Sequence, residues 1–196
     1  MRSEAAELLA KRIPEVLAFR TTLDPETDRG CALMASAYLD SQIEKLLDRC
    51  FIEDDVTVKE MLGQSKPLGT FSARIDMSYL LGRISEQARR DLHLIRKIRN
   101  DFGHDPKPLD FTSSKIADRC RELYHTPLDH NEPPRKRFTN AVLGVLAAIH
   151  AASHHAKRPP AATNLDLSPD VKKKMRKRSK AIARRLMKEF SDKKNV

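Results

Sequence analysis

A short segment near residue 100 concentrates side chains that could do chemistry. Arg96, Asn100 and His104 recur every four residues, and Arg99 directly precedes Asn100. On a helix this spacing places them along one side. Guanidinium groups bind phosphate, and an imidazole exchanges protons near neutral pH. The other side of the same helix carries an apolar stripe made of Leu92, Ile95, Ile98 and Phe102. The pattern therefore predicts phosphate-binding and acid–base capacity on the outer face of a helix.

The same polar side chains also have a structural interpretation. Arg99 would pair with a buried acid, and Asn100 would satisfy backbone carbonyls. His104 would lie at the helix C-terminus, where a cation is stabilised by the helix dipole. Residue chemistry alone leaves both interpretations open, and the structural one is the simpler.

Two other arginines are candidate binding residues. Asp28-Arg29-Gly30 stands at a predicted helix start and could hold an anion, although Asp28 as the N-cap with Arg29 on the surface is the simpler interpretation. Arg74 lies close to Asp76, where it would form an internal ion pair or contact a phosphate. We therefore take Arg29, Arg74, Arg96 and Arg99 as the candidate binding residues.

Metal and cofactor chemistry has little support. His150 and His154 lie four residues apart and could grip a metal on one helix face, but only His155 is adjacent and no acid is nearby. There is no Walker loop, GxGxxG, HExxH or nucleophile elbow. We expect neither a metal nor a cofactor.

Helical periodicity dominates the chain, and no strand alternation is convincing. The body is therefore predicted to be an all-α bundle of six or seven helices. These are expected over residues 3–20 (with a kink or break at Pro14), 27–50, 57–62, 67–81, 85–102, 113–123 and 134–155.

The net charge of +10 lies in the last segment of the chain. Residues 171–196 hold twelve Lys and Arg against two acids, so the first 170 residues balance to zero. A Pro159-Pro160 linker precedes this segment. We expect three parts: a body over 1–156, a linker over 157–167 and a basic helix over 168–196.

The predicted basic helix is amphipathic. Its apolar stripe consists of Val171, Met175, Ile182, Leu186 and Phe190. Such a helix could dock on the body, touch nucleic-acid phosphates non-specifically, or bind an anionic membrane or a calmodulin-like partner. The candidate nucleic-acid contacts are Lys172, Lys173, Lys174, Arg176, Lys177, Arg178, Arg184 and Arg185.

Composition limits the class of protein. The longest apolar run, residues 141–149, is far shorter than the roughly 20 residues of a membrane helix, and the N-terminus lacks the apolar region of a secretion signal. Cys31 and Cys50 on one helix would lie roughly 28 Å apart, and Cys120 has no evident partner. We expect a cytoplasmic protein with three reduced cysteines and no membrane contact.

Five stretches, taken together, resemble a known family. They are Asp28-Arg29-Gly30-Cys31-Ala32-Leu33, Tyr38-Leu39-Asp40, the segment from Pro67 to Ile75, Leu81-Gly82-Arg83-Ile84-Ser85, and the segment from Asp91 to His104. In this order they resemble the bacterial mannitol operon repressor family over residues 15–125. The resemblance implies a small helical protein in transcriptional control of sugar-alcohol uptake. Because the family lacks a DNA-reading motif, it also implies control through a partner protein. Gly103, where Ala is expected, and the basic tail depart from the pattern.

The Arg99-Asn100-x-x-x-His104 segment also resembles the Arg-x4–6-His signature of HEPN domains, helical bundles that often dimerise. Many are metal-independent endoribonucleases. The resemblance would make His104 the general acid or base, while Arg99 would stabilise the scissile phosphate and Asn100 would orient the site.

The leading hypothesis is a non-enzymatic regulator of the mannitol-repressor type. It would form a homodimer and act through an unidentified protein partner, with non-specific DNA or RNA contact through its tail. The alternative is a HEPN-type endoribonuclease that uses Arg99 and His104.

Overall fold

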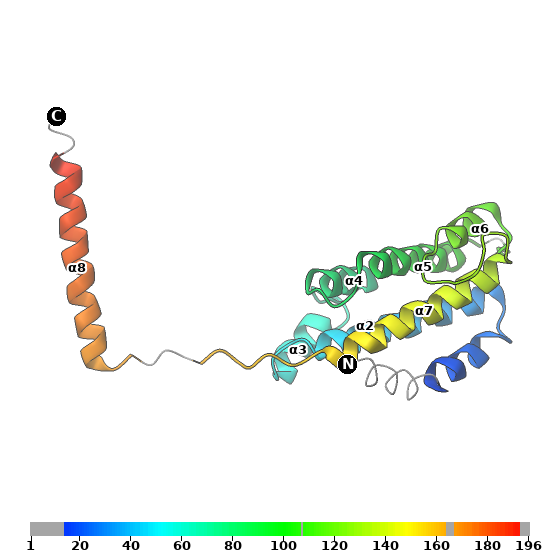
Figure 1. Ribbon diagram of the computed structural model, residues 1–196, viewed down its shortest axis with the longest axis horizontal. Helices are drawn as coiled ribbons and strands as arrows, with labels where there is room; N and C mark the ends of the chain where they lie inside the picture. The colour runs from blue at the N-terminus through cyan, green and yellow to red at the C-terminus, as the bar shows by residue number, and fades with distance from the viewer. Residues whose placement is uncertain (1–13, 107, 164–166, 193–196) are drawn as a thin grey trace. The chain divides into compact units, whose positions relative to one another are not determined.

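The computed structural model describes residues 14–106, 108–163 and 167–192, and all regular structure in them is helical (Figure 1). The predicted all-α class is confirmed. The chain divides into two compact units, residues 1–160 and residues 161–196. The first unit is the helical bundle, here called the body, and the second contains one helix.

The body begins with a helical segment over residues 14–23. The part of the helix predicted over residues 3–20 that precedes Pro14 lies outside the described residues. Helix α2, Asp28–Asp48, follows. Thr27 is its N-cap, since the Thr27 hydroxyl accepts a hydrogen bond from the Gly30 amide at 3.0 Å.

Two shorter helices come next, α3 at Asp55–Leu62 and α4 at Phe71–Leu80. The predicted start of α4 at residue 67 is wrong. Residues 66–69 form a turn, in which the Gly69 amide donates to the Lys66 carbonyl at 2.8 Å. The hydroxyl of Thr70 then caps α4 by accepting from the Ala73 amide. At its other end Gly82 takes a positive φ of 64°, as the predicted C-cap requires.

The remaining body helices are α5 at Glu86–His104, α6 at Ser114–Arg121 and α7 at Pro134–His155. Ser85 caps α5 as predicted. The helix passes through Gly103, which was expected to end it. Helix α6 ends before the predicted residue 123 because the following amides, of Tyr124 and His125, bond the buried carboxylate of Asp91.

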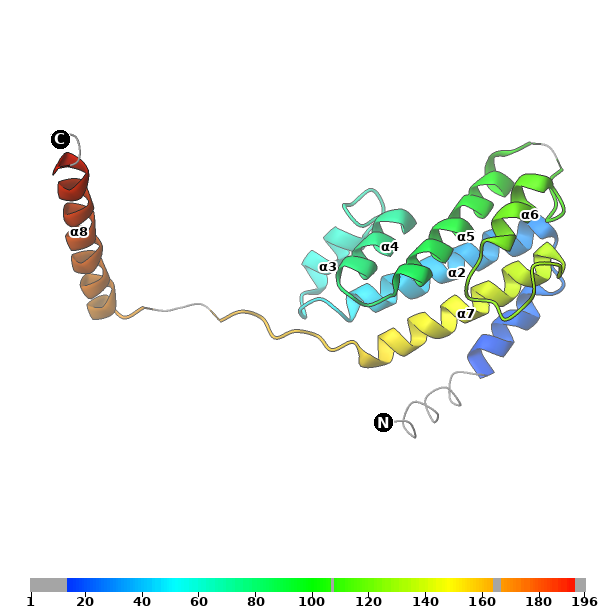
Figure 2. The ribbon, with the colours of Figure 1, turned by 45° about the horizontal axis from the view of Figure 1, so that its top comes forward.

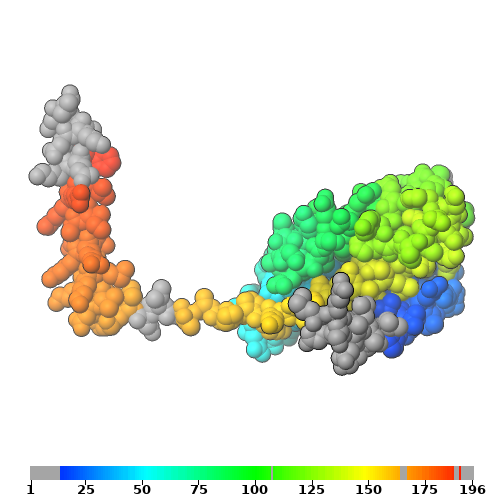
Figure 3. Space-filling view, viewed as in Figure 1, coloured from blue at the N-terminus to red at the C-terminus, as the bar shows by residue number. Residues whose placement is uncertain are grey.

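The core lies where α2, α5 and α7 pack against one another, with α4 set against α2 and α5 (Figure 2). Phe111 joins Phe102 of α5 to Phe138 of α7 through ring contacts near 5 Å. In the space-filling view, α4 and α5 and residues 14–25 lie at opposite edges of the visible face of the body (Figure 3). Cys31, Cys50 and Cys120 are buried and free, as predicted.

The second unit contains helix α8, Pro169–Asp192. Ser168 begins it as predicted, since the Lys172 amide donates to the Ser168 carbonyl at 2.9 Å. The apolar stripe of α8 is exposed. Across the described part of the chain, no helix combines the length and apolar character needed to cross a membrane.

Candidate functional site

The last two turns of α5 position the polar residues singled out in the sequence. Leu92, Ile95, Ile98 and Phe102 are all buried, as predicted. Their burial fixes the rotation of the helix, so the neighbouring polar residues face outward. Arg96, Arg99 and Asn100 are half-buried, and His104 is exposed.

Arg99 and Asn100 are joined directly. The Arg99 Nη1 donates to the Asn100 Oδ1 at 3.0 Å. Arg99 forms no ion pair within the described residues, so the expectation that it would pair with a buried acid is wrong. Its guanidinium is only partly used by the bond to Asn100.

His104 opens onto a hollow of about 500 Å³ at the end of α5. Asn100 and His104 line this hollow together with Asp101 and Asp105, and Arg99 does not. The groups of a nuclease must converge on one phosphate. Here Arg99 bonds Asn100, which lines the hollow with His104, but Arg99 is not among the lining residues.

The carboxylate of Asp101, at the hollow, ties α5 to α6. It accepts from Lys115 Nζ at 3.0 Å and forms a close ion pair with Arg119. These contacts hold the end of α5 rigid beside the hollow.

The face of α5 beside α2 is different in character. Leu33 and Met34 of α2 are 38% and 39% exposed. A Cβ placed on Gly103 of α5 would lie 3.8 Å from Leu33 Cδ2, so this part of α2 adjoins the end of α5. The Nε of Arg96 is buried without a hydrogen-bond partner. We use the name α2–α5 surface for Leu33 and Met34 on α2 together with Arg96, Arg99 and Asn100 on α5.

Arg29 and Asp28 have structural contacts. Arg29 Nη2 donates to the Asp105 carbonyl at 2.9 Å. Thr27 or Asp28 was expected to cap α2, and the cap is Thr27. Asp28 instead accepts from the Phe111 amide at 2.9 Å and from Arg135 at 2.7 Å. The start of α2 is therefore fastened to the α5–α6 connection and to α7.

Arg74 is only 7% exposed and lies inside the bundle. Its guanidinium donates to the carbonyls of Leu68 and Leu62 and pairs with Asp40 and Glu44 of α2. The expected pair with Asp76 is wrong, and these contacts leave Arg74 little capacity for a phosphate. Its role in this geometry is to fix the α3–α4 turn on α2.

Asp76 belongs to a separate surface cluster. It accepts from Arg89 Nε at 2.7 Å and from His93 Nε2 at 3.1 Å. Burial raises the pKa of Asp76, but these hydrogen bonds and charges outweigh it, so its pKa is lowered.

Two buried polar residues escaped the sequence analysis. Asp91 is fully buried and accepts from the amides of Tyr124 and His125 and from the His125 ring. Arg137, also buried, donates to carbonyls of the α6–α7 connection, including those of Cys120 and Leu123. The only sequence signal for Asp91 and Arg137 was that each is a charged residue on the side of its helix that carries the apolar stripe.

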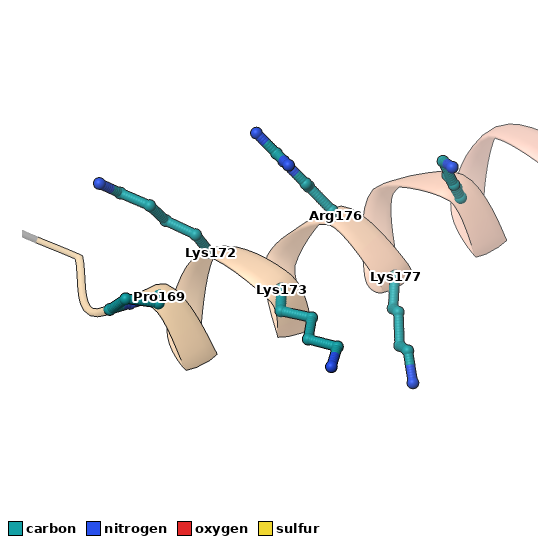
Figure 4. Close-up of a pocket in the computed structure, with 6 residues that line it drawn as sticks. Pro169, Lys172, Lys173, Arg176 and Lys177 are labelled. Carbon is teal, nitrogen blue, oxygen red and sulfur yellow. The ribbon is translucent and has the colours of Figure 1, made fainter.

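The basic residues of α8 form rows along an exposed helix. Between Val171 and Met187 the sequence has no acid. Lys172 and Arg176 point to one side and Lys173 and Lys177 to another, around a hollow of about 440 Å³ (Figure 4). In the part of the chain that the structure describes, no group of His, Cys, Asp and Glu residues could hold a metal ion.

The fold and these surfaces define a helical-bundle protein with a mixed apolar and cationic face on its body and a basic helix beyond it. The mannitol repressor family model (MtlR) matches residues 20–159. This chain belongs to the mannitol repressor family.

Individual relatives agree with this assignment. The mannitol operon repressors of Escherichia coli strain K12 and of Escherichia coli O6:H1 strain CFT073 are each 30% identical to the chain over 103 residues. The match covers 50% of this chain and 53% of each relative, so the chain spans about half the length of the curated relatives it matches. A solved complex of MtlR with HPr from Escherichia coli is 25% identical, with a TM-score of 0.46, and covers 66% of this chain and 89% of that one.

Proposed function

We propose that this protein is a cytoplasmic, non-enzymatic regulator of a mannitol-type operon and acts mainly through contacts with another protein. The observation that carries the proposal is the family match over residues 20–159. Expression of the operon would then depend on the protein being present and folded, and not on catalysis.

The test is made in the host of this chain after its gene is deleted. Transcript from the mannitol operon is expected to rise in the deletion strain and to fall when the wild-type protein is restored. An unchanged transcript level in both strains would contradict the proposal.

The α2–α5 surface supports the protein-partner part of the proposal. Exposed Leu and Met side chains beside arginines are the composition of protein interfaces, which are enriched in Met and Arg and poor in Lys and acids.

Capture from the native cytoplasm tests this surface. Wild-type protein and the His104→Ala control are expected to retain the same partner, and Leu33→Glu is expected to lose it, because a charge would be desolvated at the interface. Binding of purified HPr, the partner in the solved complex, is measured in the same series. Equal recovery with Leu33→Glu would exclude the α2–α5 surface.

The endoribonuclease alternative is tested with RNA in EDTA. The separation of Arg99 from the hollow beside His104 weighs against it. The wild-type protein is expected to leave the RNA intact. Cleavage that disappears in both His104→Ala and Arg99→Ala would instead establish the alternative.

Homodimer formation is a further part of the proposal. Tyr79, Leu80 and Leu81 form a run of exposed apolar side chains at the end of α4, and Leu80 is 77% exposed. Pairing two copies here would cover this run and leave the α2–α5 surface accessible. Sedimentation should give a dimer for the wild type and a monomer for Leu80→Glu; a wild-type monomer would contradict dimerisation.

The basic helix α8 adds weak contact with nucleic acid. Its charge would bind phosphates with an affinity that falls as salt rises. The full chain should therefore retard nucleic acid at low salt, and a chain lacking residues 160–196 should not. Equal retardation by the two chains would remove α8 from this role.

A further inference from the structure

Helix α8 distributes its cations around more than half of its circumference. Residues two apart on a helix point about 200° apart. Lys172 and Lys174 therefore face nearly opposite directions, and so do Arg176 and Arg178. Between these two outer rows lies a middle row that includes Lys173 and Lys177, which point away from Lys172 and Arg176 (Figure 4).

A flat array of phosphates would contact one outer row, while the opposite row stayed in water. A membrane could contact both outer rows only by burying the apolar stripe that lies between them, and the vesicle comparison below tests that alternative. Cations on two opposite sides match a groove with phosphates along both walls. The fit requires a groove as wide as the helix, which is about 10–12 Å across with its side chains.

The major groove of B-form DNA is about 12 Å wide and admits a helix. The major groove of duplex RNA is deep and narrow and excludes side chains. From these matches we propose that α8 binds in the major groove of duplex DNA, with the two outer rows on the flanking phosphates. This rests on the nucleic-acid contact proposed above.

The apolar stripe fits the same placement. It lies opposite the middle row, so it faces out of the groove. Val171 and Ile182 are eleven residues apart, as are Met175 and Leu186. The seven-residue step from Met175 to Ile182 is not continued at Ser168 or Glu189, so the stripe lacks the sustained seven-residue repeat of a left-handed coiled coil. The base-facing row contains Lys and Arg, which pair with guanine O6 and N7, and no Asn or Gln to read adenine, so any base preference is expected to be for G·C pairs.

The test uses the full chain and two matched double variants, Lys172→Gln with Arg176→Gln and Lys174→Gln with Arg178→Gln. The first variant removes two charges from one outer row, and the second removes two charges from the opposite outer row. Gln preserves helix propensity. Binding to a labelled mixed-sequence DNA duplex is followed by anisotropy from 50 to 200 mM salt. Both variants should lose affinity equally, and each should reduce the slope of log K against log salt by about 2.

Three further comparisons complete the test. A duplex RNA of the same sequence should bind several-fold more weakly than the DNA. Vesicles of phosphatidylglycerol and phosphatidylcholine should bind more weakly still. The double variant Ile182→Ser with Leu186→Ser should bind DNA like the wild type, because the stripe points away from the groove.

The outcomes are separable. If one outer-row variant binds DNA like the wild type, or if RNA binds as tightly as DNA, groove binding is wrong while the general phosphate contact stands. Preferential binding to vesicles, lost in the Ile182→Ser and Leu186→Ser variant, would assign α8 to a membrane surface. If deletion of residues 160–196 leaves DNA binding unchanged, the proposed contact itself fails.

Discussion

Buried arginines, and not only apolar side chains, hold the turns of this bundle in place. Arg74 and Arg137 bond backbone carbonyls in the last turn of a helix or in the connection that follows it. Carbonyls in such positions have no partner within the helix, so a buried guanidinium offsets a large desolvation cost. These residues belong to the scaffold, whereas Arg96 and Arg99 remain at its surface.

Arg74→Ala is expected to destabilise the protein by about 3 kcal/mol, because it leaves two carbonyls and two carboxylates without their partner. Urea unfolding followed by circular dichroism measures the loss. The control is Arg90→Ala, which breaks an exposed pair with Glu122 and should cost less than about 1 kcal/mol. Equal costs for the two variants would show that Arg74 is not a structural anchor.

The cysteines should be chemically inert in the folded protein. Burial raises the pKa of Cys31 to about 11 and that of Cys120 to about 12. At pH 8 only about one Cys31 thiol in a thousand is then ionised, and thiolate is the reactive form. Iodoacetamide at pH 8 should modify Cys31 and Cys120 slowly in buffer and rapidly in urea. Rapid labelling of the native protein would contradict their burial.

At the residue scale, the sequence predicted which side chains face outward better than it predicted which side chains bond to one another. The outward face of α5 follows from spacing, and so was predictable. The partners of Arg74 and Asp28 were not, because Asp40 and Arg135 come from distant helices. Sequence neighbours such as Asp76 gave the wrong pair, since Asp76 faces α5 instead.

At the scale of elements, two helical glycines have opposite roles. A Cβ on Gly144 of α7 would meet the His125 carbonyl oxygen at 2.3 Å, so the α6–α7 connection packs directly on the α7 backbone. A Cβ on Gly103 of α5 would meet only Leu33, at an ordinary contact distance of 3.8 Å.

Gly144→Ala should therefore destabilise the protein by about 1–3 kcal/mol, because backbone must move to make room. Gly103→Ala should stabilise it by about 0.5 kcal/mol through helix propensity alone. Thermal melts of the two variants give opposite shifts from the wild type. A stabilising Gly144→Ala would show that the connection does not press on α7.

Helix existence and order followed from apolar periodicity and from capping residues such as Ser85 and Gly82. Boundaries failed where long-range contacts decide them. Pro67 and Leu68 have an acceptable helical pattern but form a turn. Arg74 and the hydrogen bond that the Leu68 amide donates to the Met61 carbonyl stabilise this turn. The end of α6 is set by Asp91 on another helix.

At the scale of the whole molecule, the body should fold without the basic helix. Deleting residues 160–196 keeps Arg158, whose guanidinium pairs with Asp48 of α2 at 2.9 Å. The truncated chain is expected to melt at the temperature of the full chain and to lose helical signal only in proportion to α8. A lower melting temperature would show that the segment beyond residue 159 is part of the core.

The charge division between body and tail was readable from composition, because twelve of the Lys and Arg residues fall after residue 170. The proposed role of the α2–α5 surface was not readable in the same way. It depends on Leu33 and Met34, which helical periodicity alone places in the wide apolar face of α2, whereas the bundle leaves them exposed.

The most direct test compares three forms of the protein in the host strain that lacks its own copy: wild type, Leu33→Glu and His104→Ala. Each is first shown to fold by its thermal melt, and mannitol-operon transcript is then measured. The account predicts that wild type and His104→Ala repress equally, while Leu33→Glu does not. Repression that is lost in His104→Ala and kept in Leu33→Glu would contradict it.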